Sequence, residues 1–165
     1  MNLPTFIVAL GLAATSLTGA FSEARAEDQM VTLSPQQIGE IFCLSRLGND
    51  EAVLDGLLSP VLAASIALAE ARNAVIQAAA PDEKPPLGDG IPWQAFPDYA
   101  PQCSATISAG AIDQVNIAYA FPDQPDASWV DTLILVKDGP HLRIDDVAFG
   151  TTGTLREVLG GMFPE

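Results

Sequence analysis

The chain of 165 residues contains few of the side chains on which catalysis and metal binding most often depend. It has one histidine and two cysteines. The histidine, His141, directly follows a predicted hairpin turn, where a solvated side chain is the simpler interpretation. No Ser-His-Asp set can be assembled around it, and there is no nucleophile elbow and no phosphate-binding loop. We therefore predict no catalytic residue and no cofactor.

A metal site is also not predicted. Asp82, Glu83 and Asp89 lie close together in the sequence and carboxylates suit Ca²⁺, but their spacing does not match an EF-hand loop.

Positive charge is scarce too. Seven Lys and Arg residues stand against 21 Asp and Glu residues, which gives a net charge of -14. Such an acidic surface repels the phosphates of nucleic acid and of anionic lipid. We expect no nucleic-acid partner, and the partner is left open as an unknown small molecule or a protein.

Residues 1–26 have the pattern of a secretory signal peptide. An apolar run from Thr5 to Leu17 is followed by small residues that end in Ala24-Arg25-Ala26, an A-x-A cleavage pattern. The alternative is a membrane anchor, but the run is too short to span a bilayer. We predict cleavage after Ala26, a periplasmic or secreted protein, and no stable membrane insertion after cleavage.

Cys43 and Cys103 are the two cysteines. An even pair in an exported chain predicts a disulfide. The bond would close a loop of about 60 residues and contribute roughly 4 kcal/mol in the chain-entropy model. The alternatives are two free buried thiols or a redox pair, although redox motifs usually have closely spaced cysteines.

The first half of the chain after the signal is predicted to be helical. Ser34 fits an N-cap, Pro35 a first turn and Gln37 a capping box, and this helix should end near Gly48. A short helix over 51–58 follows, and Ser59-Pro60 begins a long Ala-rich helix that Pro81 ends. The predicted core-facing stripe of the long helix is Leu58, Leu62, Ile66, Ala69, Asn73 and Ile76.

The second half is predicted to be an antiparallel sheet. Strands are expected at 103–107 and 115–121 with a turn over 108–114, and Asp138-Gly139 marks a hairpin within 128–147. Thr154 and Glu157 form a further capping box that begins a short C-terminal helix. Helices followed by a meander predict one α+β domain over 27–165.

Three short motifs resemble a known family. Gly90-Ile91-Pro92-Trp93 before the sheet, the strand with Trp129, and the ending Ile144-Asp145-Asp146-Val147 resemble the exported bacterial domain-of-unknown-function 3828 family. That family is placed in the nuclear-transport-factor-2-like superfamily. The resemblance implies a cone-shaped α+β fold whose concave sheet forms a pocket with the helices. It implies little about activity, because that superfamily includes enzymes and non-catalytic binders.

The candidate ligand-binding residues are aromatic, with one acid. Trp93 and Tyr99 lie with Phe96 in the proline-rich segment 81–102, which is either a ligand-binding loop or a lid on the core. Tyr119 and Trp129 have the same two interpretations on the sheet. Asp145 is the candidate pocket acid, and neighbouring strand residues such as Asp145 and Asp146 are expected on opposite faces. The favoured function is a non-catalytic binding or interaction module, and the alternative is a small isomerase-like or hydrolase-like enzyme that uses a pocket Asp. A purely structural accessory protein is the third possibility.

Overall fold

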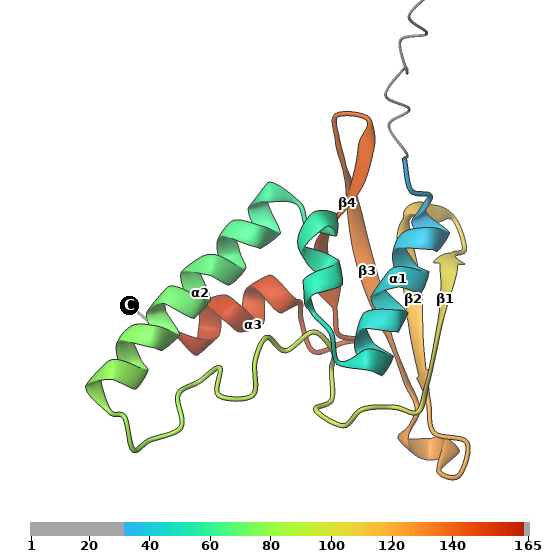
Figure 1. Ribbon diagram of the computed structural model, residues 1–165. Helices are drawn as coiled ribbons and strands as arrows, with labels where there is room; N and C mark the ends of the chain where they lie inside the picture. Colours follow the sequence, from blue (N-terminus) through green and yellow to red (C-terminus); the bar gives the residue numbers. More distant parts are fainter. Residues whose placement is uncertain (1–31, 164–165) are drawn as a thin grey trace, which may run out of the picture. The chain divides into compact units, whose positions relative to one another are not determined.

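The computed structural model describes residues 32–163, so the predicted signal peptide over 1–26 lies outside the described residues. Helices precede an open antiparallel sheet, as the sequence predicts (Figure 1). The elements in chain order are α1 (Pro35–Gly48), η1 (Ala52–Leu57), α2 (Pro60–Ala79), β1 (Gln102–Ser108), β2 (Ala111–Ala120), η2 (Pro125–Ala127), β3 (Trp129–Asp138), β4 (His141–Ala148) and α3 (Leu155–Met162). The α+β class is therefore confirmed.

Local signals in the sequence set the helix starts. The Ser34 hydroxyl accepts the N–H of Gln37, and the Gln37 side chain accepts the N–H of Ser34 at 2.9 Å, which completes the predicted capping box of α1. Ser59 caps α2 by accepting the N–H of Leu62 at 3.0 Å. Thr154 and Glu157 form the equivalent box at the start of α3. These contacts satisfy backbone donors that the first helical turn leaves unpaired.

The four strands follow one another in the order β1-β2-β3-β4, so β2 and β3 are the interior strands. Gly139 has a positive φ of 59° in the β3–β4 turn, which explains the predicted Asp138-Gly139 hairpin. The turn predicted over 108–114 is wrong. Strand β2 already begins at Ala111, and only Ala109 and Gly110, whose φ is 82°, make the turn.

A bulge interrupts the pairing of β3 with β4. Ile134 pairs with Asp146 and Leu135 with Ile144, so Asp145 is an extra residue without a partner on β3. A bulge of this kind breaks the strict alternation of side chains between the two faces. It lies where β4 approaches η1 and α2, since Leu58 forms a bridge with Ile144.

Helix α1 packs closely on the sheet. A methyl group built at Gly39 would lie 2.7 Å from side-chain atoms of both Ala105 and Val115, so this position has room for glycine alone. Ile38, which directly precedes Gly39, and Phe42, about one turn after Ile38, are fully buried. Val115, Ile117 and Tyr119, which alternate along β2, are buried on the core side of the sheet.

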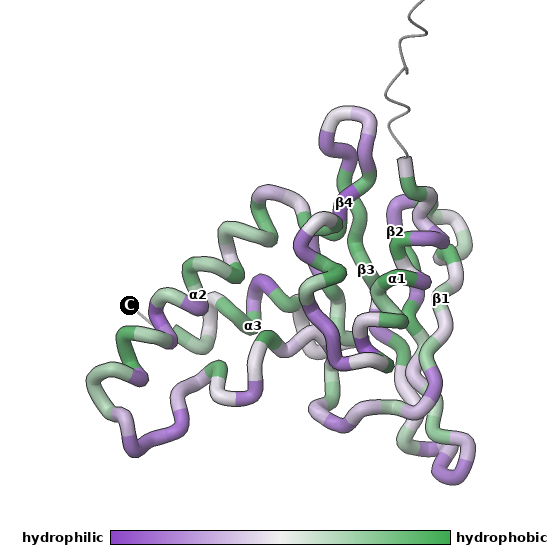
Figure 2. Tube along the Cα trace, in the orientation of Figure 1, coloured by the Kyte–Doolittle hydropathy of each residue, from purple (hydrophilic) through white to green (hydrophobic). Residues whose placement is uncertain are grey.

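Helix α2 is covered only in part. Leu62, Ile66 and Ala69 of its predicted stripe are buried, but Ile76 is 41% exposed, so the prediction is wrong near the helix end. Beyond Ala69 the domain offers α2 little to pack on, and Figure 1 shows this end of the helix extending away from the sheet. Most residues of the helix are apolar, and hydrophilic residues interrupt them mainly in its second half (Figure 2). Within residues 32–163, α2 is the one helix with the length and composition of a membrane span.

The predicted disulfide is present. Cys43 of α1 and Cys103 of β1 are bonded, with 5.4 Å between their Cα atoms, inside the range for an unforced bridge. The bond joins the helical half to the first strand and fixes the end of the preceding loop. A disulfide of this kind persists in oxidising compartments, so it supports an extracytoplasmic location.

Candidate functional site

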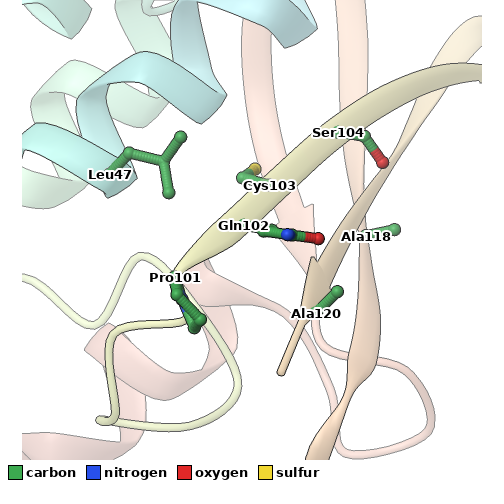
Figure 3. A pocket seen from close by; sticks show the side chains of 7 residues that line it. All are labelled: Leu47, Pro101, Gln102, Cys103, Ser104, Ala118 and Ala120. Carbon is green, nitrogen blue, oxygen red and sulfur yellow. The ribbon is translucent and has the colours of Figure 1, made fainter. Parts of the chain in front are cut away.

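Two concavities deserve comparison as candidate sites. The first has a volume of about 350 Å³ and lies beside Cys103 at the end of β1, against Leu47 of α1 (Figure 3). Its lining contains no charged side chain. Such a surface has little to orient a ligand, because small-molecule sites combine an apolar wall with a few placed polar groups.

The second concavity, the loop cavity, has that combination. Its volume of about 510 Å³ falls in the range of small-molecule sites. Most of its lining comes from the loop between α2 and β1, and the lining residues used below are Arg46, Ile91, Pro92, Trp93, Gln94, Phe96, Tyr99 and Met162. The loop cavity is therefore the candidate functional site.

Arg46 is a buried charged residue in the wall of the loop cavity. Its side chain is 4% exposed, and its guanidinium carbon lies 5.8 Å from the ring centroids of both Phe42 and Trp93. Nη2 donates to the Ser45 hydroxyl at 2.9 Å, whereas Nε has no acceptor among the described residues. Glu51 is 3.9 Å away and 42% exposed. Burial lowers the pKa of Arg46, and Glu51 opposes that shift.

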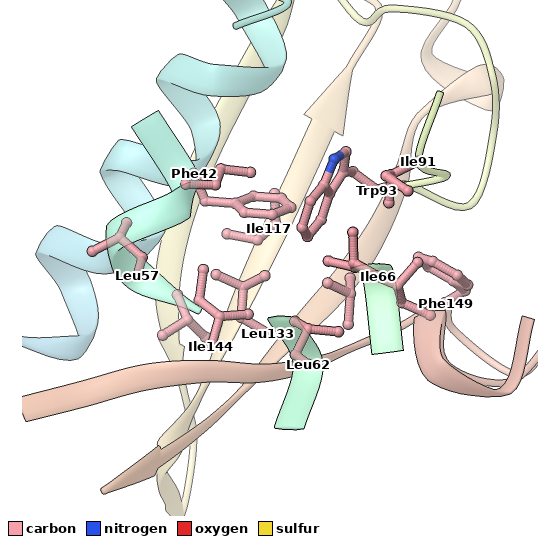
Figure 4. Close-up of a cluster of buried hydrophobic side chains, with 14 of the residues drawn as sticks. Phe42, Leu57, Leu62, Ile66, Ile91, Trp93, Ile117, Leu133, Ile144 and Phe149 are labelled. Atoms are coloured by element: carbon pink, nitrogen blue, oxygen red, sulfur yellow. The ribbon is translucent and has the colours of Figure 1, made fainter. Parts of the chain in front are cut away.

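Trp93 is a core residue and a cavity residue at once. Its side chain is 3% exposed and its ring meets Phe42 edge-on at 6.3 Å. Figure 4 shows the indole within the buried cluster, beside Phe42, Ile66 and Ile117. Among residues 32–163, the indole Nε1–H has no acceptor and Gln94 Oε1 has no donor. The packing of Trp93 therefore matches the lid interpretation, although the residue also lines the loop cavity.

Asp131 holds the loop onto the sheet. It is fully buried in β3, and its Oδ2 accepts the N–H of Ala95 at 3.0 Å and the indole N–H of Trp129 at 3.1 Å. Its Oδ1 has no donor in the described part of the chain. Burial raises the pKa of Asp131, and the two hydrogen bonds oppose the shift. Asp131 thus determines where the middle of the loop lies.

Three further contacts anchor the same loop. The N–H of Leu87 donates to the Asn73 side chain at 2.8 Å, which explains the polar residue in the predicted core-facing stripe of the long helix. The Tyr99 hydroxyl donates to Asn49 at 2.6 Å, although the Tyr99 side chain is 53% exposed. The disulfide at Cys103 fixes the far end. The loop over 80–101, called the strap below, is therefore fixed at several points along its length, and it forms most of the wall of the loop cavity.

Tyr119 and Trp129 form a stacked pair on β2 and β3. Their ring centroids are 4.6 Å apart with planes 20° from parallel, and Phe96 meets Trp129 edge-on at 5.1 Å. Tyr119 is 2% exposed, and burial raises the pKa of its hydroxyl, with Asp131 adding to the shift. Neither Tyr119 nor Trp129 lines the loop cavity. They support the strap from beneath.

Asp145 lies elsewhere, in an ion-pair cluster with Arg156. Asp145 Oδ2 lies 3.1 Å from Arg156 Nη2, and Asp146 Oδ2 lies 3.0 Å from Arg156 Nε. The prediction that the two carboxylates face apart is wrong, because the bulge at Asp145 breaks the alternation of β4. Asp145 also accepts the Ser59 hydroxyl at 2.7 Å, and Asp146 accepts the Arg156 N–H at 3.1 Å. Both acids therefore hold β4, α2 and α3 together, away from the loop cavity.

Sequence reasoning missed Arg46 and Asp131. Arg46 follows apolar residues in the last turn of a helix, where a basic residue usually faces water and favours the helix dipole. Asp131 has a weak signal, since it stands at an inward position of a strand, with Leu133 and Leu135 two and four residues on. An acid at such a position is usually paired or functional, because an isolated charge is costly to bury.

The chain was compared with family models, curated proteins and solved structures, and none of these comparisons gives a match.

Proposed function

We propose that the protein is an exported, non-catalytic module that binds a small molecule in the loop cavity. One observation carries the proposal. Arg46 Nε, Trp93 Nε1 and Gln94 Oε1 are buried and unpartnered among the described residues, and all three side chains line this cavity. Buried polar atoms are nearly always paired in folded proteins. Leaving these atoms unpaired costs free energy. A ligand that accepts from the first two atoms and donates to the third removes this free-energy cost.

The arrangement of acids favours binding over catalysis. A general acid or base must reach the reacting group of the substrate. Asp145 and Asp146 are paired with Arg156, and Asp131, whose raised pKa would suit an acid, faces the strap rather than the loop cavity. The alternative, a small pocket enzyme that uses an Asp, would need the strap to move off Asp131.

Export is part of the proposal. The disulfide and the signal-like residues 1–26 together support a periplasmic or secreted protein that is cleaved after Ala26. N-terminal sequencing of the protein recovered from the periplasmic fraction tests this, and Glu27 is the expected first residue. A mature chain that begins at Met1 would overturn cleavage.

The family resemblance also enters as a proposal. Helices that precede an antiparallel meander support membership of the nuclear-transport-factor-2-like superfamily, and so does a cavity that helix α1 helps to line. The proposed site differs from the concave-sheet pocket that the resemblance implies, because loop residues supply most of its wall.

Native mass spectrometry of protein purified from the periplasm tests binding. We expect a bound small molecule that Phe96→Ala releases, since Phe96 lines the loop cavity and is 54% exposed, so its truncation costs little stability. Ile112→Ala is the matched control, because Ile112 is 83% exposed on β2 and lines none of the cavities described above. Equal ligand loss in both variants, or turnover of a co-purified compound, would contradict the proposal.

A further inference from the structure

We infer that the ligand of the loop cavity carries a single carboxylate that pairs with the guanidinium of Arg46, attached to an apolar, flat body. The inference rests on the proposed function. It starts from a charge that the folded chain leaves poorly compensated: the Arg46 side chain is 4% exposed, while its one acidic neighbour within 4.0 Å, Glu51, is 3.9 Å away.

The surroundings of Arg46 compensate this charge only in part. The rings of Phe42 and Trp93 face the guanidinium, and the C-terminal end of α1 adds partial negative charge. Neither supplies an acceptor for Nε, which has no partner in the described residues. A guanidinium whose Nε–H has no acceptor can pair with a carboxylate through a charge-assisted hydrogen bond.

The rest of the lining favours a ligand with one negative charge. Among the described residues, Arg46 is the one basic side chain in the wall of the loop cavity, and the exposed Asp89 in the same wall is already paired with Lys84. A phosphate monoester, with up to two charges, would leave one of them unpaired. Ile91, Phe96 and Met162 supply apolar surface for the body of the ligand, and Trp93 Nε1 offers one further donor.

Calorimetric titration with paired probes tests this inference. Phenylacetate and phenylacetamide form one pair, and indole-3-acetate and indole-3-acetamide a larger one. We expect each acid to bind the native protein at least about tenfold more tightly than its amide, the scale of one charge-assisted hydrogen bond. Arg46→Met should remove the preference, and Arg46→Lys should keep part of it.

Stability measurements separate a binding role from a structural one. Replacing a poorly paired buried charge by an apolar side chain of similar size is often neutral or stabilising. The ligand-free Arg46→Met variant should therefore melt at or above the native temperature. Equal affinity for acids and amides would overturn the inference that the ligand carries a carboxylate, but it would leave the proposal that the loop cavity binds a ligand intact. Binding of neither probe of either pair would overturn both proposals, and a strongly destabilised Arg46→Met would assign Arg46 to the fold.

A second inference rests on α2 and is independent of the loop cavity. We propose that α2 pairs with α2 of a second copy of this chain in an antiparallel, two-fold arrangement. The exposed side of the helix carries a stripe with successive spacings of three and four residues, which we call the α2 stripe: Val61, Ala64, Leu68, Ala71, Val75 and Ala78. This is the a/d repeat of paired helices.

The α2 stripe is complementary to itself. Large residues and alanines alternate along it, and in antiparallel pairing each a residue meets a d residue of the partner. Val61 then meets Ala78, Ala64 meets Val75 and Leu68 meets Ala71, so every layer holds one large and one small side chain. The two-fold axis of this register passes through the midpoint of Pro60–Ala79, so the two helices overlap along their whole length.

The charge distribution limits where two copies can meet. The chain has a net charge of -14, so two copies repel each other over most of their surface, and a face without net charge is the favoured place of contact. Glu70 and Arg72 are the charged residues of α2, and their charges cancel. Val75 is 71% exposed, Val61 55% and Leu68 54%, and Figure 2 shows the apolar character of the helix. Two such helices bury on the order of 1,000 Å², the low end for a specific interface.

Sedimentation velocity at graded protein concentrations tests the pairing. We expect a reversible dimer that strengthens between about 0.05 M and 0.5 M NaCl, because salt screens the repulsion of the acidic copies and leaves the apolar contact intact. Leu68→Glu should give a monomer at all concentrations, whereas Ile112→Glu, on an exposed position of β2, should not. A native protein that stays monomeric up to about 1 mM would overturn the proposal. So would a Leu68→Glu variant that dimerises as well as the native protein. Binding of the native protein to neutral phosphatidylcholine vesicles, in place of dimerisation, would also overturn it.

Discussion

Asp131 accepts the backbone N–H of Ala95 at 3.0 Å, across 36 residues of sequence. This single contact joins the middle of the proline-rich strap to an interior strand of the sheet. The same carboxylate oxygen also accepts the Trp129 indole N–H. The position of the strap, and with it the shape of the loop cavity, therefore depends on a buried acid that makes no contact with the cavity itself.

The burial of Asp131 predicts a specific pH dependence of stability. Because burial raises its pKa in the folded protein above the unfolded value of about 3.9, the folded state holds a proton that the unfolded state releases. This contribution is present at low pH and is lost as pH rises through the folded pKa. Asp131→Asn keeps an acceptor for Ala95 and has no such titration. Its stability relative to the native protein should therefore increase between pH 4 and pH 7.

Denaturant unfolding of both proteins at several pH values measures this difference. Asp126→Asn, the same substitution on an exposed position before β3, is the control. A difference for Asp131→Asn that is constant between pH 4 and pH 7 would show that Asp131 titrates alike in the folded and unfolded chains.

The cluster at Arg156 predicts unequal roles for two neighbouring acids. Asp146→Ala should cost roughly 1–3 kcal/mol, because Asp146 is buried and its loss leaves a backbone N–H of Arg156 without an acceptor. Asp145→Ala should cost less than about 1 kcal/mol, since its side chain is 21% exposed and Arg156 keeps Asp146. Chemical denaturation ranks the two variants. A larger cost at Asp145 would contradict the assigned geometry, and loss of ligand binding in Asp145→Ala would return it to the candidate site.

Trp93 allows packing to be separated from its polar atom. Trp93→Ala should cost about 3–5 kcal/mol, the usual effect of truncating a buried large aromatic. Trp93→Phe keeps much of the ring and removes Nε1–H, which has no partner in the described residues, so it should cost far less. Thermal unfolding beside a ligand titration distinguishes the two roles. A Trp93→Phe variant with native stability and weakened ligand binding is the expected result, and full binding by that variant would restrict Trp93 to the core.

The Cys43–Cys103 bond predicts a large loss on removal. Replacing both cysteines by alanine opens a loop with a sequence separation of 60, which should cost roughly 4 kcal/mol in the chain-entropy model. Equilibrium unfolding of this variant, compared with the native protein with and without reductant, measures the effect. Because the bond anchors the far end of the strap, we also expect weaker ligand binding in the variant at temperatures where it is still folded. Identical unfolding curves for reduced and oxidised native protein would contradict this prediction.

Much of the fold was determined by the sequence itself, because the signals concerned are local. The capping residues Ser34, Ser59 and Thr154 bond to backbone groups three residues away, so the helix starts follow from short motifs. The hairpin at Asp138-Gly139 follows from a turn that needs glycine at positive φ. Cysteine count and the export pattern were enough to predict the disulfide.

The sequence indicated Trp93 and Tyr99 of the candidate site, whereas only the tertiary structure decided its buried charged residues. Arg46 is buried because the strap brings Trp93 over it, and Asp131 is buried because its neighbours on β3 face the core, so both depend on contacts between distant segments. The bulge at Asp145 overrides the alternation from which the faces of β4 were predicted. The exposure of α2 depends on how far the sheet and α3 extend beneath it. Hydrophobic periodicity records which side of a helix is apolar, but where both sides are apolar it does not say which of them the domain covers.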